Sequence, residues 1–366
     1  MSVADLALQR NKYKHLSDDE WRWFLQQVEG RERTAEKLPT FAAIEDWWYP
    51  VRLSCEQCSS ELAARNKASL VSGKTMVDLT GGYGVDTYFL SEGFEHTDYV
   101  EHNEELCRIA EHNFSNKSIT IHNITAEEFL KTAGQYDLIF LDPARRDIHG
   151  GKVFRLEDCT PNVVELLPTL LARGKRLMIK LSPMLDLTQA VTSLSQVKWD
   201  IYVVAIKNEV KEVLLLSQEQ KVKSQETTIT AIDLAKKDQA FVFTKEEELN
   251  YSLEIGHWTL ENYLYEPNAA ILKAGAYKLI AQRFGLHKLD VNTHLYVSDT
   301  FVENFPGRVW KIVEHKDLKQ ANVLTRNYPL TPEQLKKKLH LRDGGTAFVI
   351  GCRVNGKPTL FTAERV

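Results

Sequence analysis

The spacing of apolar positions changes along the 366-residue chain and predicts two kinds of structure. Residues 1–66 follow a helical period, and Ser17 and Glu20 have the spacing of a capping box. An apolar stripe follows at helical spacing, consisting of Trp21, Phe24, Leu25 and Val28. A second helix is predicted from about Ser54 through Leu70. The N-terminal part of the chain is therefore expected to be a helical region.

From residue 75 onward, short apolar runs alternate with amphipathic stretches. The apolar runs are residues 76–79, 98–100, 119–121, 138–141, 176–179, 201–205 and 213–216. Helices are predicted between them over residues 103–114, 125–132, 160–172 and 186–195. This alternation is typical of a parallel sheet with helices on both faces. The last two runs lie too close together for a crossover helix, so a hairpin is expected to make the final strand antiparallel.

The alternation stops after about Ser217. A strand pair is predicted around Ile229–Leu234 and Ala240–Thr244, and a helix over Asn268–Phe284 that ends at Gly285. Residues 299–366 read as a compact α+β unit. Its elements are a strand at Arg308–Val313, a helix opened by Thr331-Pro332-Glu333, and a hairpin from Ala347–Arg353 through Asn355-Gly356 to Thr359–Thr362.

Composition limits the class of protein. With 43% hydrophobic and 26% charged residues the chain is an ordinary soluble globular protein, neither disordered nor collagen-like. No apolar run approaches the ~18 residues of a membrane helix, and the N-terminus is too polar for a signal peptide. Five cysteines, an odd and widely spaced set, favour a reducing compartment. A cytoplasmic protein without membrane association is expected.

Charge is unevenly distributed. The net charge of the chain is −4, but residues 301–366 carry twelve Lys/Arg against six acids, so this segment is +6 and the remainder is −10. A basic appendage on an acidic body is suited to docking a polyanion such as RNA. An ordinary solvated surface is the alternative interpretation.

The loop VDLTGGYGVD follows the first predicted strand and carries the clearest chemical signal. Its glycines permit a tight turn and let the backbone approach a ligand. Gly82 and Gly84 supply the first two glycines of a dinucleotide loop, but the third position is Thr87. Asp78 before the loop disfavours an anion and suits an amino group. The loop therefore predicts a ligand without phosphates.

Glu101 ends the second predicted strand, twenty residues after Gly81. A carboxylate in this position clasps two ribose hydroxyls in a doubly wound fold. An acid before a glycine loop together with a ribose-binding acid describes S-adenosylmethionine. The alternative is a generic strand-to-helix turn with an acid present by chance.

The segment Asp142-Pro143-Ala144-Arg145-Arg146 ends the fourth predicted strand, where central strands face the ligand crevice. The Asp142 carboxylate and a proline-flanked carbonyl can hold an amino or amide nucleophile in line with a donated methyl group. Arg145 and Arg146 can pair with a substrate phosphate or carboxylate. A turn with surface arginines is the alternative.

Two further features are weaker. Lys180 ends the fifth predicted strand, facing the crevice, and is a candidate partner of substrate or of a carboxylate, or else a solvated strand end. Cys55 and Cys58 have the spacing of a metal pair, but no second pair or suitable His follows, so no metal is expected.

Together the glycine loop, Glu101, the DPARRD element and the antiparallel last strand resemble a class I S-adenosylmethionine-dependent methyltransferase. More narrowly, three segments resemble a bacterial family of such enzymes with a ferredoxin-like domain and a C-terminal THUMP-like domain. They are Glu56–Glu61 with Ala64 and Lys67, Lys180–Pro183, and Glu209–Glu212. The resemblance implies a Rossmann-like seven-stranded α/β sheet with an N-terminal helical region and small C-terminal α+β domains.

The resemblance also implies site residues. Cofactor binding maps onto Asp78, Gly81, Gly82, Gly84 and Glu101, and the position near adenine, often an Asp in such enzymes, falls at Thr125. Asp142 and Pro143 map onto the acceptor motif of amino-methylating enzymes, and Arg145 and Lys180 are the further catalytic candidates on the grounds given above. Amino-methylating enzymes usually have an aromatic residue where this chain has Arg145.

The sequence thus predicts a methyltransferase that acts on RNA by direct in-line transfer, with S-adenosylmethionine as donor and the basic C-terminal domain docking the RNA. Methylation of a protein or small molecule is an alternative, as is a catalytically silent cofactor- and RNA-binding module. The expected domains are a helical region at 1–66, a methyltransferase domain at 67–255, a ferredoxin-like domain at 256–298 and a THUMP-like domain at 299–366.

Overall fold

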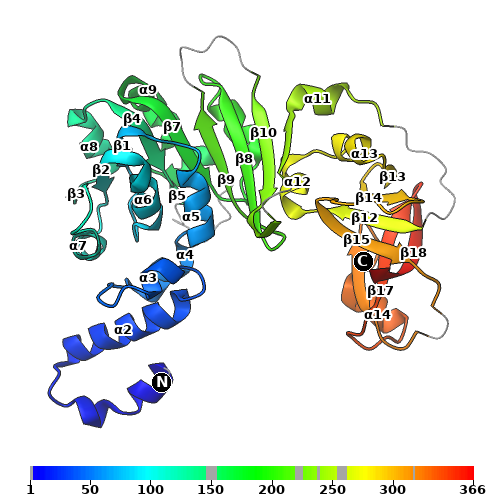
Figure 1. The fold of residues 1–366 in the computed structure, drawn as a ribbon, viewed down its shortest axis with the longest axis horizontal. Helices are drawn as coiled ribbons and strands as arrows, with labels where there is room; N and C mark the ends of the chain where they lie inside the picture. The colour runs from blue at the N-terminus through cyan, green and yellow to red at the C-terminus, as the bar shows by residue number, and fades with distance from the viewer. Residues whose placement is uncertain (1–2, 146–154, 219–225, 237–239, 254–261, 316–317) are drawn as a thin grey trace. The chain divides into compact units, whose positions relative to one another are not determined.

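The computed structural model describes residues 3–145, 155–218, 226–236, 240–253, 262–315 and 318–366. By its internal contacts the chain divides into two compact units (Figure 1). Unit 1 is Met1–Trp199 with Leu214–Lys223, and unit 2 is Asp200–Val213 with Ser224–Val366. Within the described ranges, no helix is long and apolar enough to cross a membrane. All five cysteines are free thiols.

Unit 1 begins with a series of helices. They are α1 (Val3–Ala7), α2 (Asp18–Thr34), α3 (Pro39–Ala42), α4 (Arg52–Gln57) and α5 (Glu61–Ala68). The predicted capping box of α2 is confirmed: Glu20 N donates to the Ser17 hydroxyl, and Ser17 N donates to the Glu20 carboxylate. The single helix predicted over 54–70 is two helices, because Cys58 is extended and Ser60 caps a new helix.

The main sheet has the strand order β11-β10-β8-β9-β7-β4-β1-β2-β3. Its strands are β1 (Gly73–Asp78), β2 (Phe94–Val100), β3 (Ile119–His122), β4 (Tyr136–Leu141), β7 (Gly174–Leu181), β8 (Trp199–Ile206), β9 (Glu209–Ser217), β10 (Thr228–Asp233) and β11 (Phe241–Thr244). The intervening helices are α6 (Val85–Leu90), α7 (Glu104–Asn113), α8 (Ala126–Thr132), α9 (Val163–Arg173) and α10 (Leu187–Ser193). The seven predicted strands are all present.

Two points of the sheet refine the prediction. The β8–β9 connection is a two-residue turn in which Lys207 and Asn208 both have positive φ, the conformation that joins antiparallel strands tightly. The strand pair predicted after Ser217 extends the sheet to nine strands, because β10 pairs parallel with β8 and β11 pairs antiparallel with β10. A further short pair, β5 (Ala144–Arg145) with β6 (Cys159–Thr160), lies beyond β4.

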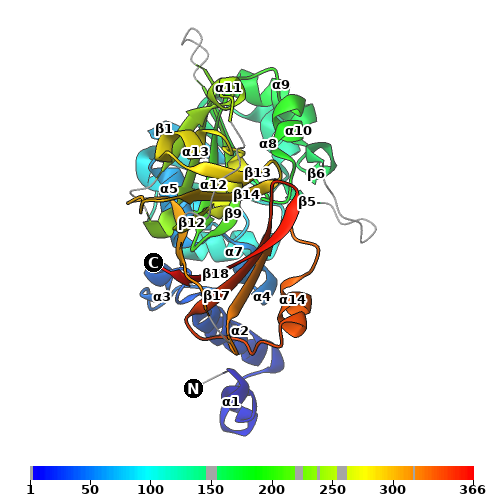
Figure 2. The ribbon, with the colours of Figure 1, turned by 90° about the vertical axis from the view of Figure 1, so that its right-hand side faces the viewer.

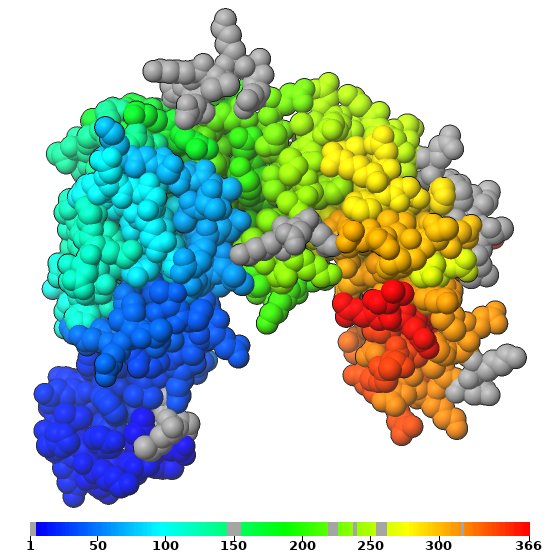
Figure 3. All heavy atoms as spheres, in the orientation of Figure 1, coloured from blue at the N-terminus to red at the C-terminus, as the bar shows by residue number. Residues whose placement is uncertain are grey.

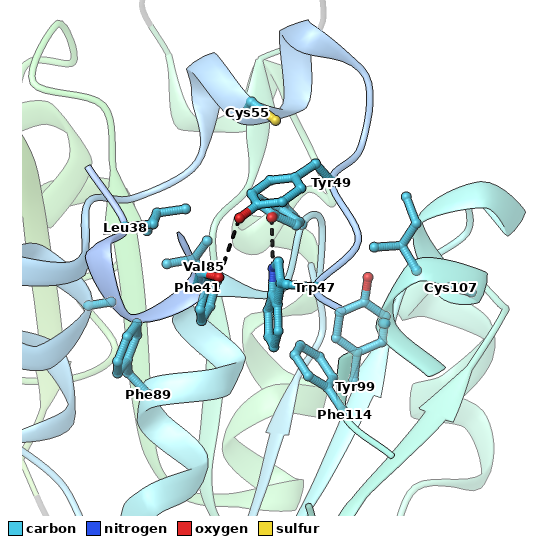
Figure 4. Close-up of a cluster of buried hydrophobic side chains, with 14 residues drawn as sticks. Leu38, Phe41, Trp47, Tyr49, Cys55, Val85, Phe89, Tyr99, Cys107 and Phe114 are labelled. Atoms are coloured by element: carbon cyan, nitrogen blue, oxygen red, sulfur yellow. Dashed lines mark hydrogen bonds between the residues drawn. The ribbon is translucent and has the colours of Figure 1, made fainter. Parts of the chain in front are cut away.

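An aromatic core joins the N-terminal helices to the loop after β1 (Figure 4). Phe41 stacks on Trp47 with ring centroids 4.0 Å apart, and Trp47 Nε1 donates to the Tyr83 hydroxyl at 2.9 Å. Tyr83 lies within the glycine loop itself. In the space-filling view the N-terminal region (dark blue) adjoins the part of unit 1 that follows it in sequence (light blue to cyan) (Figure 3). The N-terminal region therefore supports the glycine loop by packing against Tyr83.

Unit 2 contains a seven-stranded sheet of order β13-β14-β12-β15-β18-β17-β16. The strands are β12 (Tyr263–Pro267), β13 (His287–Asp290), β14 (Thr293–Ser298), β15 (Gly307–Ile312), β16 (Asn322–Arg326), β17 (Ala347–Val354) and β18 (Lys357–Arg365). The helices are α11 (Lys245–Asn250), α12 (Ala269–Ala274), α13 (Leu279–Phe284) and α14 (Pro332–Lys338). Figure 2 shows the long β17–β18 hairpin beside α14.

Local signals in this unit were predicted well, with one exception. Asn355 and Gly356 both have positive φ and close the β17–β18 hairpin, and Thr331 opens α14 with a capping box. The helix predicted over 268–284 is divided, because Gly275 adopts a left-handed conformation (φ 84°) that ends α12. Gly285 ends α13 in the same way, as predicted.

Candidate functional site

A cavity of about 600 Å³ opens at the carboxyl ends of β1, β2 and β4 in unit 1. Its lining combines the glycine loop, the ends of these strands and the junction between α4 and α5. Among the lining residues are Ser54, Gln57, Cys58, Ser59, Asp78, Thr80, Gly81, Gly82, Gly84, Asp86, Glu101, Thr125, Asp142 and Lys180. Its volume lies within the ~300–1,000 Å³ range typical of small-molecule sites.

The glycine loop leaves its backbone close to this cavity. A Cβ on Gly81 would lie 2.2 Å from the Tyr99 ring, so only glycine fits there. Gly82 and Gly84 have positive φ (56° and 82°), and a Cβ on Gly84 would clash with Phe114 at 2.4 Å. The Tyr99 hydroxyl donates to the Gly82 carbonyl at 2.5 Å. The loop is therefore shaped by buried aromatic rings beneath it.

Asp78 organises the same loop from the end of β1. One carboxylate oxygen accepts from Thr80 N at 2.9 Å, and the other accepts from the Thr87 hydroxyl at 2.6 Å. Burial raises the pKa of Asp78 to about 7, although these hydrogen bonds favour its ionised form. Thr80 also links two motifs, because its hydroxyl accepts from Asp142 N at 2.7 Å.

Glu101 follows β2 and faces the loop across the cavity. Its carboxylate accepts from Gly82 N at 3.0 Å and from Asn103 N at 2.8 Å, and lies 2.9 Å from His102 Nδ1. Its side chain is only 9% exposed. A carboxylate has about four lone-pair sites, so Glu101 retains acceptor capacity for a ligand.

Asp142 and Lys180 form an ion pair, with Lys180 Nζ 2.5 Å from Asp142 Oδ2. Lys180 also contacts Asp86 Oδ2 at 3.3 Å and donates to the Ser59 hydroxyl at 3.1 Å. The Asp142 side chain is 39% exposed, whereas that of Lys180 is 13% exposed. Lys180 therefore fixes the direction of a carboxylate that faces the cavity.

Asp86 continues this network into the interior. Its Oδ1 lies 3.2 Å from Lys67 Nζ, whose side chain is fully buried, and its Oδ2 accepts from the Ser59 hydroxyl at 2.7 Å. Burial opposes ionisation of Asp86, but the charges of Lys67 and Lys180 outweigh it and lower the pKa of this carboxyl to about 2. Two lysines and two aspartates thus form a charge-balanced network along the wall of the cavity, with Lys67 as its innermost member.

The structure brings most of the predicted site residues together. Those that line the cavity are Asp78, Gly81, Gly82, Gly84, Glu101, Thr125, Asp142 and Lys180. Thr125 caps α8 by accepting from Glu128 N. Pro143 is half-buried between two lining residues, Asp142 and Ala144, but does not line the cavity itself. Arg145 has its backbone in β5, while its side chain and all of Arg146 lie outside the described residues.

Sequence reasoning missed the inner half of the network. Ser59, Lys67 and Asp86 all lie in segments that carry the family resemblance, but no role was predicted for them. The available signal was Asp86 in the apolar helix VDTYFL, whereas Lys67 lies among other polar residues of its helix. Within the described residues, no group of three His, Cys, Asp or Glu side chains is placed to hold a metal ion. Cys55 and Cys58 instead contact backbone carbonyls.

Comparisons with known proteins agree with this architecture. A family model for a ferredoxin-like domain matches residues 263–306, and a THUMP domain-like model matches residues 307–365. A crystal structure of a methyltransferase candidate from Porphyromonas gingivalis W83 is 32% identical with a TM-score of 0.85. The match covers 96% of this chain and 92% of that chain.

Curated relatives extend the comparison in sequence. Two proteins from Mycobacterium tuberculosis, of strains CDC 1551 / Oshkosh and ATCC 25618 / H37Rv, are each 21% identical over 349 residues. Each match covers 91% of this chain and 92% of the relative. Both relatives bear the name "Uncharacterized S-adenosylmethionine-dependent methyltransferase".

Proposed function

The chain belongs to the family of S-adenosylmethionine-dependent methyltransferases with ferredoxin-like and THUMP-like C-terminal domains, and we propose that its methyl acceptor is RNA. The proposed reaction is a direct in-line transfer to an amino group or base, without a metal and without a covalent enzyme intermediate.

The donor set of the unit 1 cavity fits the cofactor. S-adenosylmethionine is cationic at its sulfonium and amino groups, and two carboxylates, Asp78 and Glu101, line the cavity. At Gly82 an added Cβ would meet nothing closer than the Thr80 carbonyl at 3.7 Å, so the backbone there is open to a ligand. These features support binding of a cation rather than a pyrophosphate.

We assign the cofactor contacts residue by residue. Gly81, Gly82 and Gly84 let the backbone approach the methionine part, and Asp78 holds the loop and offers its carboxylate to the amino group. The Glu101 carboxylate accepts hydrogen bonds from the ribose hydroxyls through the lone pairs that are not used by Gly82 N and Asn103 N. Thr125 lies at the adenine end of this set.

When bound, the cofactor supplies an electrophilic methyl group. Asp142 accepts a hydrogen bond from the acceptor amino group and orients its lone pair, so that its contribution is mainly positional. Lys180 keeps the Asp142 carboxylate in place through their 2.5 Å contact. Pro143 presents a carbonyl without a competing N–H. Arg145 is assigned to substrate phosphate or carboxylate.

The observation that carries the RNA assignment is the THUMP-like match at residues 307–365, which falls within the segment of net charge +6. Excess positive charge on one domain supports docking of a phosphate backbone, which positions a nucleic acid without reading its sequence. The five free cysteines support a cytoplasmic, reducing location.

The test uses labelled S-adenosylmethionine and total RNA from a strain that lacks the gene. We expect label in RNA, at one nucleotide that mapping then identifies. Label in protein or in small molecules of the same extract, with none in RNA, would contradict the RNA assignment. Cofactor binding without any transfer would identify a silent module.

A further inference from the structure

Unit 2 contains a second cavity, which is smaller and distant in sequence from the glycine loop. Its volume is about 240 Å³, below the ~300–1,000 Å³ that encloses a whole small molecule. Among its lining residues are Lys236, Phe301, Asn304, Arg308 and Arg365. A cavity of this size suits one unit of a larger ligand.

Three cations line the cavity, and one of them is held by a buried acid. Arg308 lies 2.5 Å from the carboxylate of Glu266, which is 3% exposed, and the same carboxylate also binds Arg326. One carboxylate cannot neutralise two guanidinium groups, so the cluster keeps a net positive charge. Lys236 and Arg365 are exposed and add to it. The cavity therefore favours an anion.

Arg308 is also prepared to donate. Its guanidinium lies over the Trp310 ring at 5.6 Å from the centroid, and its Nε is buried without a hydrogen-bond partner among the described residues. Buried N–H groups are normally paired, so this donor is available to an acceptor that enters the cavity or to water.

An exposed aromatic ring lies beside these cations. Phe301 is 45% exposed, so one part of its ring is accessible to a ligand. Its ring is backed by Tyr263, with centroids 5.6 Å apart, so its position is supported from one side. Asn304 adds an exposed amide, which can both donate and accept hydrogen bonds.

We propose that this cavity is a single-nucleotide subsite for an unpaired residue of the RNA substrate. The base stacks on Phe301, and a phosphate binds Arg308, Lys236 and Arg365. Stacking on an aromatic ring together with cations along the backbone is how proteins hold single-stranded nucleic acid. The inference rests on the proposed function, since it names a contact of the same RNA.

The test measures binding of a labelled single-stranded oligoribonucleotide to the full chain by fluorescence anisotropy at several salt concentrations. Phe301→Ala should weaken binding between about five- and 150-fold, without a change in the salt slope, because it removes a ring and no charge. Phe301→Tyr keeps the ring and should bind within about twofold of the parent, whereas Phe301→Leu should bind like the alanine variant.

The charge contact is tested by Lys236→Gln with Arg365→Gln, which should lower the salt slope by about one. Lys319→Gln with Lys357→Gln is the matched control, since these two exposed cations of unit 2 do not line the cavity. The control pair should lower affinity less than the cavity pair. Arg308 is left unchanged in this test because it is paired with the buried Glu266. Its replacement would alter that ion-pair cluster as well as the cavity.

The outcomes separate the two proposals. If the parent binds and methylates RNA and the Phe301 and cavity-cation variants do so equally well, the subsite is wrong and the RNA assignment stands. If Phe301→Leu binds like the parent, stacking is excluded. If the parent neither binds nor methylates RNA, both proposals fail together.

Discussion

The two units of the molecule bury charge in opposite ways. In unit 1, Lys67 and Lys180 face Asp86 and Asp142, so positive and negative groups are equal in number. In unit 2, the single carboxylate of Glu266 faces two arginines. In the first cluster Lys67, Asp86 and Lys180 are at most 13% exposed and only Asp142, at the cavity, is 39% exposed, whereas the two arginines of the second cluster are 29% and 38% exposed.

The difference matches the ligands that each unit is proposed to bind. The balanced network leaves Asp78, Glu101 and Glu127 as the carboxyl groups of the unit 1 cavity that lie outside it, and these favour a cationic cofactor. An unbalanced cluster leaves positive charge beside the unit 2 cavity, which attracts phosphate. Buried ion pairs stabilise little compared with apolar packing, so both clusters are better explained by what they orient than by the stability they add.

Breaking the balanced cluster should have the largest effect. Asp86→Ala leaves the fully buried Lys67 without its 3.2 Å carboxylate partner. Loss of one member of a buried pair destabilises a protein by about 3–5 kcal/mol. We expect this decrease in the free energy of unfolding, measured by urea denaturation.

Two controls sharpen this prediction. The double variant Lys67→Met with Asp86→Leu removes both charges and should recover most of the lost stability. Glu266→Gln in unit 2 should destabilise by only about 1–2 kcal/mol, because its arginines reach solvent. Equal losses for Asp86→Ala and Glu266→Gln would remove the contrast between the two clusters.

Asp142→Ala tests whether the cavity side of the network acts in catalysis. Lys180 keeps Asp86 and Ser59 as partners in this variant, so the fold should persist. Loss of the orienting acceptor should lower the rate of methyl transfer about 10²-fold, equal to ~2.7 kcal/mol, while cofactor affinity stays within about threefold. Single-turnover transfer and calorimetry measure the two quantities. An unchanged rate would exclude Asp142 as the acceptor-orienting group.

Glu101→Ala tests the proposed ribose contact. Removal of a charge-assisted hydrogen bond should weaken binding of S-adenosylmethionine and of its demethylated product by ~1.5–3 kcal/mol. Calorimetry should also show that NAD does not compete. Because Glu101 accepts from Gly82 N and Asn103 N, Glu101→Gln is the matched variant that keeps an acceptor oxygen. Unchanged affinity in the alanine variant would refute the ribose assignment.

The features predicted from sequence are those set by local chemistry. The capping residues Ser17 and Thr331 and the Asn355-Gly356 turn act through neighbours within a few positions, and each is found as predicted. The strand ends that carry Asp78, Glu101 and Asp142 follow from the strand–helix alternation, because parallel strands end at one edge of the sheet.

The features missed depend on partners far away in the chain. Lys67 reads as one more polar residue of a helix, and its burial becomes visible only when α5 packs beside α6 and brings Asp86 to it. The helix breaks at Cys58 and Gly275 were missed because a single turn residue inside an apolar period is a weak signal. The cavity of unit 2 joins Lys236, Phe301 and Arg365, which no periodicity relates.

The pKa of Asp78, raised to about 7 by burial, predicts a pH effect confined to unit 1. Its ordinary pKa is about 3.9, so the folded chain binds more protons than the unfolded chain between about pH 4 and 7. Stability conferred by the protonated form is complete below about pH 4 and is lost as pH rises through about 7. Relative to the Asp78→Asn variant, the free energy of unfolding of the parent should fall by up to ~1.4 kcal/mol for each unit that the pH rises in this range. Urea denaturation from pH 4.5 to 7.5 measures this, and parallel curves for the two proteins would contradict it.

The smallest expected effect concerns the lysines of α14 in unit 2. Lys336 is paired with Asp343 at 2.9 Å, whereas Lys337 and Lys338 are exposed. These three consecutive lysines belong to the basic segment that is expected to dock RNA. The two exposed ones are the better candidates for a contact, and consecutive residues of a helix point in different directions. Replacing all three by Ala should lower the salt slope of RNA binding by about one to two.

Cofactor affinity should not change in this triple variant, because the glycine loop and Glu101 belong to unit 1. Lys336→Ala alone serves as the internal control, since its charge is already balanced by Asp343 and its loss should leave the slope nearly unaltered. If the triple variant binds and methylates RNA like the parent at every salt concentration, α14 is only a solvated surface and does not contact RNA. RNA would then have to bind through the arginines beside Glu266. The difference in charge between the two units would in that case depend on this cluster alone.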